Sequence, residues 1–335
     1  MKALILAGGS GERFWPLSTP DTPKQFLKLF GSKTLIRQTF ERISPPLDPE
    51  DICVVTLERY AQKTLEELPE LPKENIIAEP AKKNTAPAII LGTLYIGENE
   101  TIAVLPADHL IKEKKKFWEV IEKAAAVAQK TQSIVTIGIK PTRPETGYGY
   151  IETAEEIEEN VYKVKRFREK PDYETAVEFI EKGNFYWNGG MFIFTGKTLL
   201  KEAKDHSPQI YEKLSSIDIK NFQKLKKVYE EMEPISIDYA IMEKTENIVM
   251  VKANFYWSDV GNWVSVKEIE GYTKESENIA LIDSENVFIR GISKKIAVVG
   301  LRDVIIVETN EGLLIMSESA APKVRNAVKK FYSST

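Results

Sequence analysis

The chain has 335 residues, of which 42% are hydrophobic and 29% are charged, a composition typical of an ordinary globular protein. Its formal net charge is only -4, which excludes a general basic field for nucleic acid, so an anionic ligand needs a local cationic cluster. The N-terminal run MKALILAGG is too short for a secretory core, and no other run approaches the ~20 apolar residues that span a bilayer. The single cysteine, Cys53, lies in the apolar run ICVVT and fits the core of a protein in a reducing compartment. We therefore expect a cytoplasmic protein without nucleic-acid or membrane partners.

Apolar runs of strand length alternate with helical patterns through the first part of the chain. The expected strands are Lys2–Leu6, Ile52–Thr56, Asn75–Ala78, Thr101–Leu105 and Ile134–Ile139. The expected helices are Thr34–Arg42, Arg59–Glu67, Thr85–Tyr95 and Phe117–Lys130. This alternation predicts a Rossmann-like α/β fold, with a mixed, mostly parallel sheet covered by helices.

The pattern changes after Pro141. The strings GYGYIE, VYKVKRF, GMFIFT and IVMVKAN indicate further strands, with a helix at Tyr173–Lys182 and three more helical runs before the last of them. From about Tyr272 the segments NVFIRG, KKIAVVG, RDVIIVET and GLLIMS are short and β-rich, and APKVRNAVKKF reads as an amphipathic helix. Their spacing suits either a meander or a short β-solenoid, such as a left-handed β-helix. We expect a catalytic domain at 1–270 and a small β-rich domain at 271–335.

The first strand leads directly into the loop AGGSGERFWPLSTPDTPKQF. Gly8, Gly9 and Gly11 let backbone amides approach a phosphate closely, and Arg13 and Lys24 add positive charge. The loop lacks the third glycine of a Rossmann fingerprint and the Lys-Ser/Thr of a P-loop, so neither a dehydrogenase nor a P-loop kinase follows. The simpler alternative is a glycine-rich turn with two surface cations.

These residues also carry a family resemblance. The string GGSGERFWPLSTPDTPKQF resembles the signature of the sugar nucleotidyltransferases, and its PLS and PKQF portions resemble the mannose-1-phosphate guanylyltransferase family in particular. The resemblance continues in order through EPAKKNTAPAI, LPADH, PTRPETGYGYI, FREKP, NFYWNGGMF, SIDYAIMEK, WSDVGNW and VVGLRDVIIVET. Many members of this family carry a further isomerase domain of the cupin type, and isomerase activity is not expected for this chain.

Two aspartates are candidate metal ligands. Asp108 follows an apolar strand, at the edge where open α/β sheets bind ligands, and Asp259 lies in WSDVGNW between Trp257 and Trp263. The resemblance implies that Asp108 and Asp259 together hold the Mg2+ that bridges the reacting phosphates, and magnesium usually takes one or two protein carboxylates with substrate phosphates. For Asp259 the alternative is a cap of the following turn or helix. His109 next to Asp108 is expected to be structural.

The sugar side of the site is expected in three further strings. Lys170 in FREKP suits the sugar 1-phosphate, Glu169 can accept hydrogen bonds from hydroxyls, and Asn188 in NGGM can both donate and accept them. Gly147 in TGYGYI resembles the sugar-contacting strand of the family. A solvated lysine and a turn asparagine are the alternatives, and Asp238 can bind sugar or cap a helix.

The resemblance places the nucleobase against the backbone of Leu6, Ala7, Gly8 and Gly9 and against the segment that contains Asn84 and Thr85. An Asn-Thr pair can also form nothing more than a helix N-terminus, with Pro87 in its first turn. The choice of guanine therefore comes from the family likeness alone.

The resemblance implies an enzyme that transfers GMP from GTP to mannose 1-phosphate, giving GDP-mannose and pyrophosphate. Arg13, Lys24 and the metal would neutralise the phosphates during an in-line displacement. The alternatives are a relative that uses another triphosphate or hexose phosphate, and a silent regulatory paralogue. A homodimer is expected through the apolar C-terminal strands.

Overall fold

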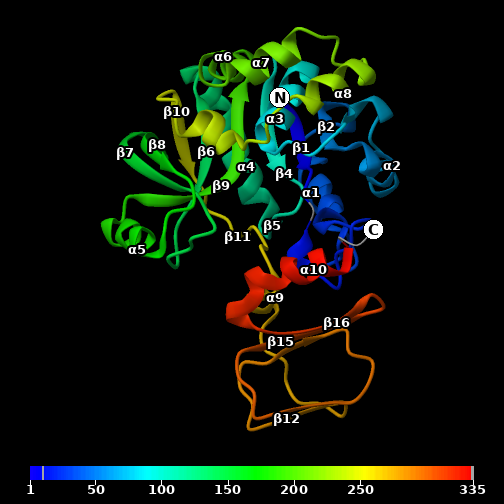
Figure 1. The fold of residues 1–335 in the computed structure, drawn as a ribbon. Coiled ribbons are helices and arrows are strands. Elements are labelled where there is room, and N and C mark those ends of the chain that lie inside the picture. Colours follow the sequence, from blue (N-terminus) through cyan, green and yellow to red (C-terminus); the bar gives the residue numbers. More distant parts are fainter. Residues whose placement is uncertain (10, 333–335) are drawn as a thin grey trace. The chain divides into compact units, whose positions relative to one another are not determined.

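The computed structural model describes residues 1–9 and 11–332, so Ser10 of the glycine loop lies outside the described residues. It confirms the predicted α/β class with a β-rich C-terminal part (Figure 1). The residues form two compact units. The first unit comprises Met1–Gly8, Thr39–Ala107 and Ile111–Trp257, and the second comprises Gly9–Gln38, Asp108–Leu110 and Ser258–Thr335. The expected domain boundary after residue 270 stays a prediction.

A mixed sheet forms the centre of the first unit. Its strands are β1 (Lys2–Ala7), β2 (Ile52–Leu57), β3 (Ile76–Glu79), β4 (Thr101–Pro106), β6 (Ile134–Ile139), β7 (Tyr150–Glu158), β8 (Val161–Arg168), β9 (Phe185–Thr195) and β10 (Ile248–Lys252). They lie in the order β3-β2-β1-β4-β9-β6-β10-β8-β7. Pairing is parallel along β3-β2-β1-β4 and between β6 and β10, while β9 is antiparallel to both β4 and β6. Two short strands are β5 (Leu110–Ile111) and β11 (Trp257–Ser258).

Helices cover this sheet. They are α2 (Glu58–Glu67), α3 (Thr85–Ile96), α4 (Lys114–Thr131), α5 (Tyr173–Lys182), α6 (Gly196–His206), α7 (Pro208–Ser215) and α8 (Phe222–Glu230), and α1 (Leu35–Ile43) joins the two units in sequence. Helix α3 is apolar all round because it is buried, packing against β1 and β2. Gly92 permits this approach, since a Cβ there would lie 2.4 Å from Cδ2 of Leu4.

The C-terminal strands of the second unit decide between the two expected topologies. They are β12 (Ile279–Ile282), β13 (Phe288–Arg290), β14 (Ile296–Val299), β15 (Val304–Thr309) and β16 (Gly312–Ser317). Strand β12 pairs in parallel with β14 and β13 with β15, and each pair joins residues 17 positions apart, such as Ile279 with Ile296. Parallel pairing at one fixed offset is typical of the coils of a β-solenoid and not of a meander. An antiparallel hairpin of β15 and β16 follows these coils.

A shared core connects these coils to the N-terminal loop of the same unit. Phe14, Trp15, Trp263 and Ile305 belong to one buried apolar cluster. The indole Nε1 of Trp263, in α9 (Trp263–Glu270), donates to the carbonyl of Trp15 at 3.0 Å, and its ring meets Phe14 edge to face at 5.6 Å. The final helix, α10 (Val324–Tyr332), contributes Val324 and Val328 to this cluster. The loop that carries Arg13 and Lys24 is thus built on the C-terminal segments of the chain.

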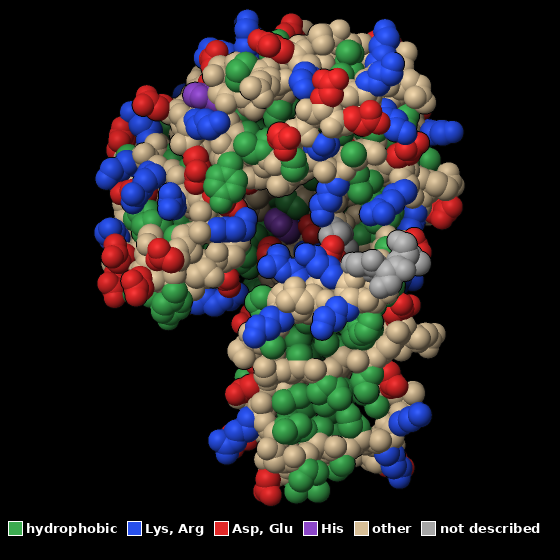
Figure 2. Space-filling model, viewed as in Figure 1, with side chains coloured by type: hydrophobic (Ala, Val, Ile, Leu, Met, Phe, Trp, Pro, Cys, Tyr) green, Lys and Arg blue, Asp and Glu red, His purple; other side chains and the backbone are tan. Residues whose placement is uncertain are grey.

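Hydrophobic side chains also reach the surface of the C-terminal coils, as Figure 2 shows. The exposed large apolar residues of these segments are Ile282, Val299, Leu301, Leu313 and Ile315. Among the described residues, no helix is long and apolar enough to cross a membrane.

Two isoleucines of the terminal hairpin, Ile305 and Ile315, predict a contrast in stability. Ile305 is fully buried, so Ile305→Ala should lower the free energy of unfolding by about 2–5 kcal/mol through lost burial and a residual cavity. Ile315 on the partner strand is 62% exposed, so Ile315→Ala should cost less than about 1 kcal/mol. Urea unfolding of both variants measures this, and equal losses would contradict the assigned core.

Candidate active site

The glycine loop after β1 is shaped by close backbone packing. Gly11 has a φ of +65°, and a Cβ on it would lie 2.5 Å from the backbone nitrogen of Lys24. The hydroxyl of Ser18 donates to the carbonyl of Gly11 at 2.7 Å. A side chain at position 11 would therefore displace the short helical turn Lys24–Phe26. Gly9 lies beside Asp108, whose Oδ2 is 4.0 Å from the Cβ position of that glycine.

Lys24, Asp108 and Asp259, all predicted site residues, come together in the second unit. The Nζ of Lys24 lies 2.8 Å from Oδ2 of Asp108 and donates to the backbone carbonyl of Asp259 at 2.5 Å. Burial alone would raise the pKa of Asp108, but the charges of Lys24 and His109, together with hydrogen bonds from Lys24 and the backbone, lower it overall. Asp108 is thus an ionised carboxylate held against a buried ammonium.

The loop that carries Asp259 is under local strain. Val260 has a φ of +47°, a conformation that β-branched residues rarely adopt, and its side chain is fully buried. The hydroxyl of Ser258 accepts the N–H of Val260 at 3.1 Å, and the exposed Arg13 donates from its guanidinium to the carbonyl of Gly261 at 3.3 Å. Helix α9 is capped by Asn262, whose side chain accepts the N–H of Val264, so the helix cap is not Asp259.

The sugar-side residues form a second cluster, in the first unit. Lys170 pairs with Glu169, which is only 8% exposed. Burial lowers the pKa of Lys170, but the hydrogen bond and charge of Glu169, together with the charges of Asp238 and Tyr239, raise it overall. Lys170 has a φ of +46°, and its N–H donates to the carbonyl of Tyr148 at 3.2 Å. The carboxylate of Glu243 accepts the backbone N–H of Glu169 at 2.8 Å. These bonds hold a left-handed residue at the predicted sugar-phosphate position.

Asn188 joins this cluster from β9. Its amide Nδ2 donates to Asp238 at 3.1 Å, and its Oδ1 accepts from the hydroxyl of Thr136 at 3.1 Å. Burial and the nearby Glu169 raise the pKa of Asp238 to about 6. Asp238 begins a π-helical turn, Asp238–Met242, and the hydroxyl of Ser236 accepts the N–H of Tyr239. Asp238 is therefore part of the polar cluster.

The two glycines of TGYGYI differ in their surroundings. A Cβ on Gly149 would lie 2.5 Å from Oε2 of Glu169 and 3.3 Å from Cβ of Asn188. The N–H of Gly147, the predicted residue, donates to the carboxylate of Glu145 at 3.0 Å. Gly149 is thus the closer neighbour of the sugar-side cluster, and sequence reasoning passed over it.

The predicted base-side segment begins helix α3. Oδ1 of Asn84 accepts the N–H of Thr85 at 2.9 Å, and Asn84 has a φ of +70°. The hydroxyl of Thr85 accepts the N–H of Ile237 at 2.8 Å. Both residues therefore carry structural bonds of the kind that the helix-terminus alternative requires.

Glu79 is a candidate site residue that the sequence reasoning missed. It ends β3, is only 4% exposed, and its Oε2 lies 3.8 Å from the Cβ position of Gly8 in the predicted nucleotide loop. Its Oε1 accepts the hydroxyl hydrogen of Tyr229 at 3.1 Å, yet burial still raises the pKa of Glu79 to about 7. A carboxylate at the end of a buried strand, as in EPAKKNTAPAI, was the available signal.

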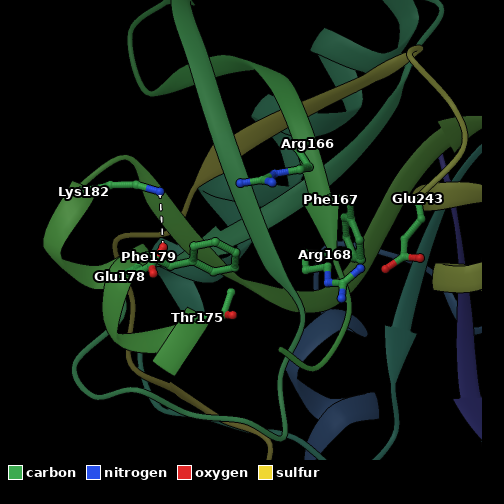
Figure 3. Close-up of a pocket in the computed structure, with 8 residues that line it drawn as sticks. All are labelled: Arg166, Phe167, Arg168, Thr175, Glu178, Phe179, Lys182 and Glu243. Atoms are coloured by element: carbon green, nitrogen blue, oxygen red, sulfur yellow. Dashed lines mark ion pairs between the residues drawn. The ribbon is translucent and has the colours of Figure 1, made fainter. Parts of the chain in front are cut away.

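A cavity of about 480 Å³ lies in the first unit, shown in Figure 3. Its lining consists of Arg166, Phe167, Arg168, Thr175, Glu178, Phe179, Lys182 and Glu243. The predicted site residues, all within the described ranges, lie outside this lining. One lining residue, Glu243, also contacts the sugar-side cluster, because its carboxylate accepts the backbone N–H of Glu169.

Comparison with known proteins matches this arrangement to a family. The nucleotidyl transferase family model matches residues 2–276, and the MannoseP isomerase/GMP-like β-helix domain model matches residues 277–331. The chain belongs to the nucleotidyl transferase family. The predicted family is therefore confirmed, and the second match agrees with the parallel coils of the C-terminal strands.

Similar proteins span nearly the whole of this nucleotidyl transferase. It is 37% identical to a mannose-1-phosphate guanylyltransferase of Escherichia coli, over 97% of this chain and 74% of the relative. It is 36% identical to the alginate biosynthesis protein AlgA of Pseudomonas fluorescens, over 98% of this chain and 71% of the relative. A solved structure described as a mannose-1-phosphate geranyltransferase from Thermus thermophilus is 32% identical, covers 98% of both chains and has a TM-score of 0.87.

Nucleotidyl transferases typically use a divalent metal ion. In this member of the family, Oδ2 of Asp108 and the backbone carbonyl of Asp259 both contact one cation, the ammonium of Lys24. Hard divalent ions take oxygen donors and complete their coordination with water and substrate phosphates. The donor set of this nucleotidyl transferase therefore fits such an ion.

The raised pKa of Glu79 predicts a pH effect on the stability of this nucleotidyl transferase. An unfolded glutamate titrates near 4.3, so between about pH 4.5 and 7 the folded chain holds a proton that the unfolded chain loses. The free energy of unfolding should therefore fall across this range by on the order of 3 kcal/mol from this group. Glu79→Gln lacks this contribution, so it should gain stability relative to the parent chain as pH rises.

Urea unfolding of both proteins at pH 5 and pH 8 measures the effect as a difference. The pKa of Asp238 is also raised, but Asp238 is present in both proteins, so its contribution cancels in the difference between their free energies of unfolding. A difference that does not change with pH would contradict the burial of an ionisable Glu79.

Proposed function

We propose that this protein transfers GMP from GTP to mannose 1-phosphate, releasing pyrophosphate and GDP-mannose. The observation that carries the proposal is the convergence of Lys24, Asp108 and the Asp259 loop beside the glycine loop. Similarity to the E. coli mannose-1-phosphate guanylyltransferase supports the choice of substrates. The attacking group is already an anion at neutral pH, so the protein's task is to position two anions and to stabilise charge.

The triphosphate is assigned to the second unit. Backbone amides of Gly9 and Gly11 would face the phosphates, because no side chain intervenes there. Arg13 is exposed and Lys24 is mounted on a fixed turn, and both would neutralise the charge that grows on the leaving pyrophosphate. Arg13 also bonds the carbonyl of Gly261, which ties its position to the Asp259 loop.

Asp108 and Asp259 would hold the metal, for which we propose Mg2+. When bound, Mg2+ supplies positive charge to the reacting phosphate oxygens. The strained Val260 follows Asp259 directly in the loop, and Asp108 stays ionised beside Lys24.

The sugar 1-phosphate is assigned to the first unit. Lys170 would bind its phosphate, while Glu169, Asn188 and the backbone at Gly147 would bind hydroxyls. Support comes from the bonds that hold these groups in place, above all the Glu243 carboxylate on the N–H of Glu169. The reaction needs both clusters to act on the same pair of substrates.

Guanine is assigned to the backbone of Leu6, Ala7 and Gly8 and to the helix terminus at Asn84 and Thr85. Glu79 supports a guanine over other bases. Guanine presents a ring N–H and an amino group along one edge, and a carboxylate accepts both. Oε2 of Glu79 lies beside Gly8, on the side away from its bond with Tyr229.

We also propose that the protein is a cytoplasmic homodimer that binds neither nucleic acid nor membranes. Its single cysteine is buried and unbridged, as expected in a reducing compartment. The exposed apolar residues of the C-terminal coils, such as Ile282 and Val299, are the surface that we assign to the dimer.

The proposed function predicts the outcome of a pyrophosphate-release assay. Each of GTP, ATP, UTP and dTTP is combined with mannose 1-phosphate and with glucose 1-phosphate, in the presence of Mg2+. GTP with mannose 1-phosphate should give the highest kcat/KM, because Glu79 favours guanine and the similarity to mannose-1-phosphate guanylyltransferases favours mannose.

Asp108→Asn is the control for this assay. It keeps the shape of the side chain but removes its charge. Turnover should fall at least about 100-fold, because loss of one group that stabilises the transition state electrostatically has an effect of this size. A different best pair would overturn the substrate assignment. Near-normal turnover of Asp108→Asn at saturating Mg2+ would overturn the site, and no turnover with any pair would support a silent paralogue.

A further inference from the structure

The two predicted cationic residues of the glycine loop, Arg13 and Lys24, differ in their exposure to solvent. Arg13 is exposed to solvent, whereas Lys24 is only 8% exposed. Lysine is almost never buried to this extent unless it is paired. Its partners here are the carboxylate of Asp108 and the carbonyl of Asp259, the two residues assigned to the metal. The ammonium therefore contacts Oδ2 of Asp108, an oxygen that a divalent ion bound to this carboxylate would use.

The backbone of Lys24 is held by the packing of its turn, whereas the polar contacts of its side chain are made by the terminal ammonium, with Asp108 and Asp259. Gly11 packs directly against the Lys24 backbone, and Phe26 donates its N–H to Pro23 to close the short turn. The side chain itself is a flexible four-carbon stem that ends in a point charge. The ammonium can therefore leave Asp108 for another anion without any movement of the loop.

An ammonium and a divalent ion cannot share Oδ2 of Asp108 at low cost. Magnesium requires its oxygen ligands at about 2.1 Å, and an ammonium 2.8 Å from the same oxygen would repel it strongly. A triphosphate changes this balance, because it brings enough negative charge for both cations. Lys24 would then bind a phosphate oxygen while Asp108 binds the metal.

We propose that Lys24 competes with the divalent ion for Asp108, so that the protein binds metal weakly until a nucleotide draws Lys24 away. This inference rests on the proposed metal and triphosphate sites but not on which nucleotide or sugar is used. It makes the metal and the nucleotide thermodynamically coupled ligands, each of which tightens the binding of the other. Lys24 is the residue through which this coupling acts.

The test is a titration of the full chain with Mn2+ alone, with free Mn2+ measured by electron paramagnetic resonance. Removing the competing charge in Lys24→Met should tighten Mn2+ binding by at least about tenfold, within the range of typical couplings between sites. If Lys24 only supported the fold, its removal would weaken Mn2+ binding. Tighter Mn2+ binding by Lys24→Met therefore indicates competition and not a structural role.

Three matched variants accompany Lys24→Met. Lys24→Arg keeps a cation and should bind Mn2+ no more tightly than the parent chain. Lys28→Met removes an exposed lysine four residues away and should change nothing. The double variant with Lys24→Met and Asp108→Asn should lose the gain, because the metal ligand is gone.

The inference is overturned if Lys24→Met binds Mn2+ no more tightly than the parent chain. It is equally overturned if Lys24→Arg or Lys28→Met shows the same gain, or if the double variant keeps it. A different best substrate pair in the pyrophosphate assay would change the proposed function and leave this result standing. The two proposals therefore fail separately.

Discussion

The contact on which the account depends is the one between the ammonium of Lys24 and Oδ2 of Asp108, at 2.8 Å. It joins the phosphate loop to the LPADH segment of the chain and also brings in the carbonyl of Asp259. A buried pair of this kind costs desolvation, which its geometry must offset. Under the proposed function, the same groups bind the phosphates and the metal, which accounts for a pair of this cost.

A strained backbone residue occurs both in the loop of Asp259 and in the sugar-side cluster. Val260 and Lys170 both have φ values near the left-handed helical region, although neither is glycine. Val260 is fixed by burial and by the Ser258 hydroxyl, and Lys170 by the carbonyl of Tyr148 with Glu243 supporting the preceding residue. Strain of this kind persists only where surrounding contacts over-determine it, which is how each loop presents one defined set of polar groups.

Much of this could be read from the sequence because its signals are local. Helix Tyr173–Lys182 and strand Ile134–Ile139 have the predicted bounds, since periodicity and caps mark them directly. The choice between meander and solenoid was not local, because both show the same alternation and differ only in which strands pair. Glu79 was missed for a similar reason. Tyr229, whose hydroxyl donates a hydrogen bond to the buried Glu79, is 150 positions away in the chain.

We have proposed that the carboxylate of Asp108 binds Lys24 in the free protein and the metal once a nucleotide is bound. The most direct measurement is a crystal structure of the protein with Mn2+ and a non-hydrolysable GTP analogue. The account predicts the metal on Asp108 and Asp259, with Nζ of Lys24 about 3 Å from a phosphate oxygen and no longer bonded to Asp108. A complex in which Lys24 still pairs with Asp108, and the metal binds elsewhere, would contradict it.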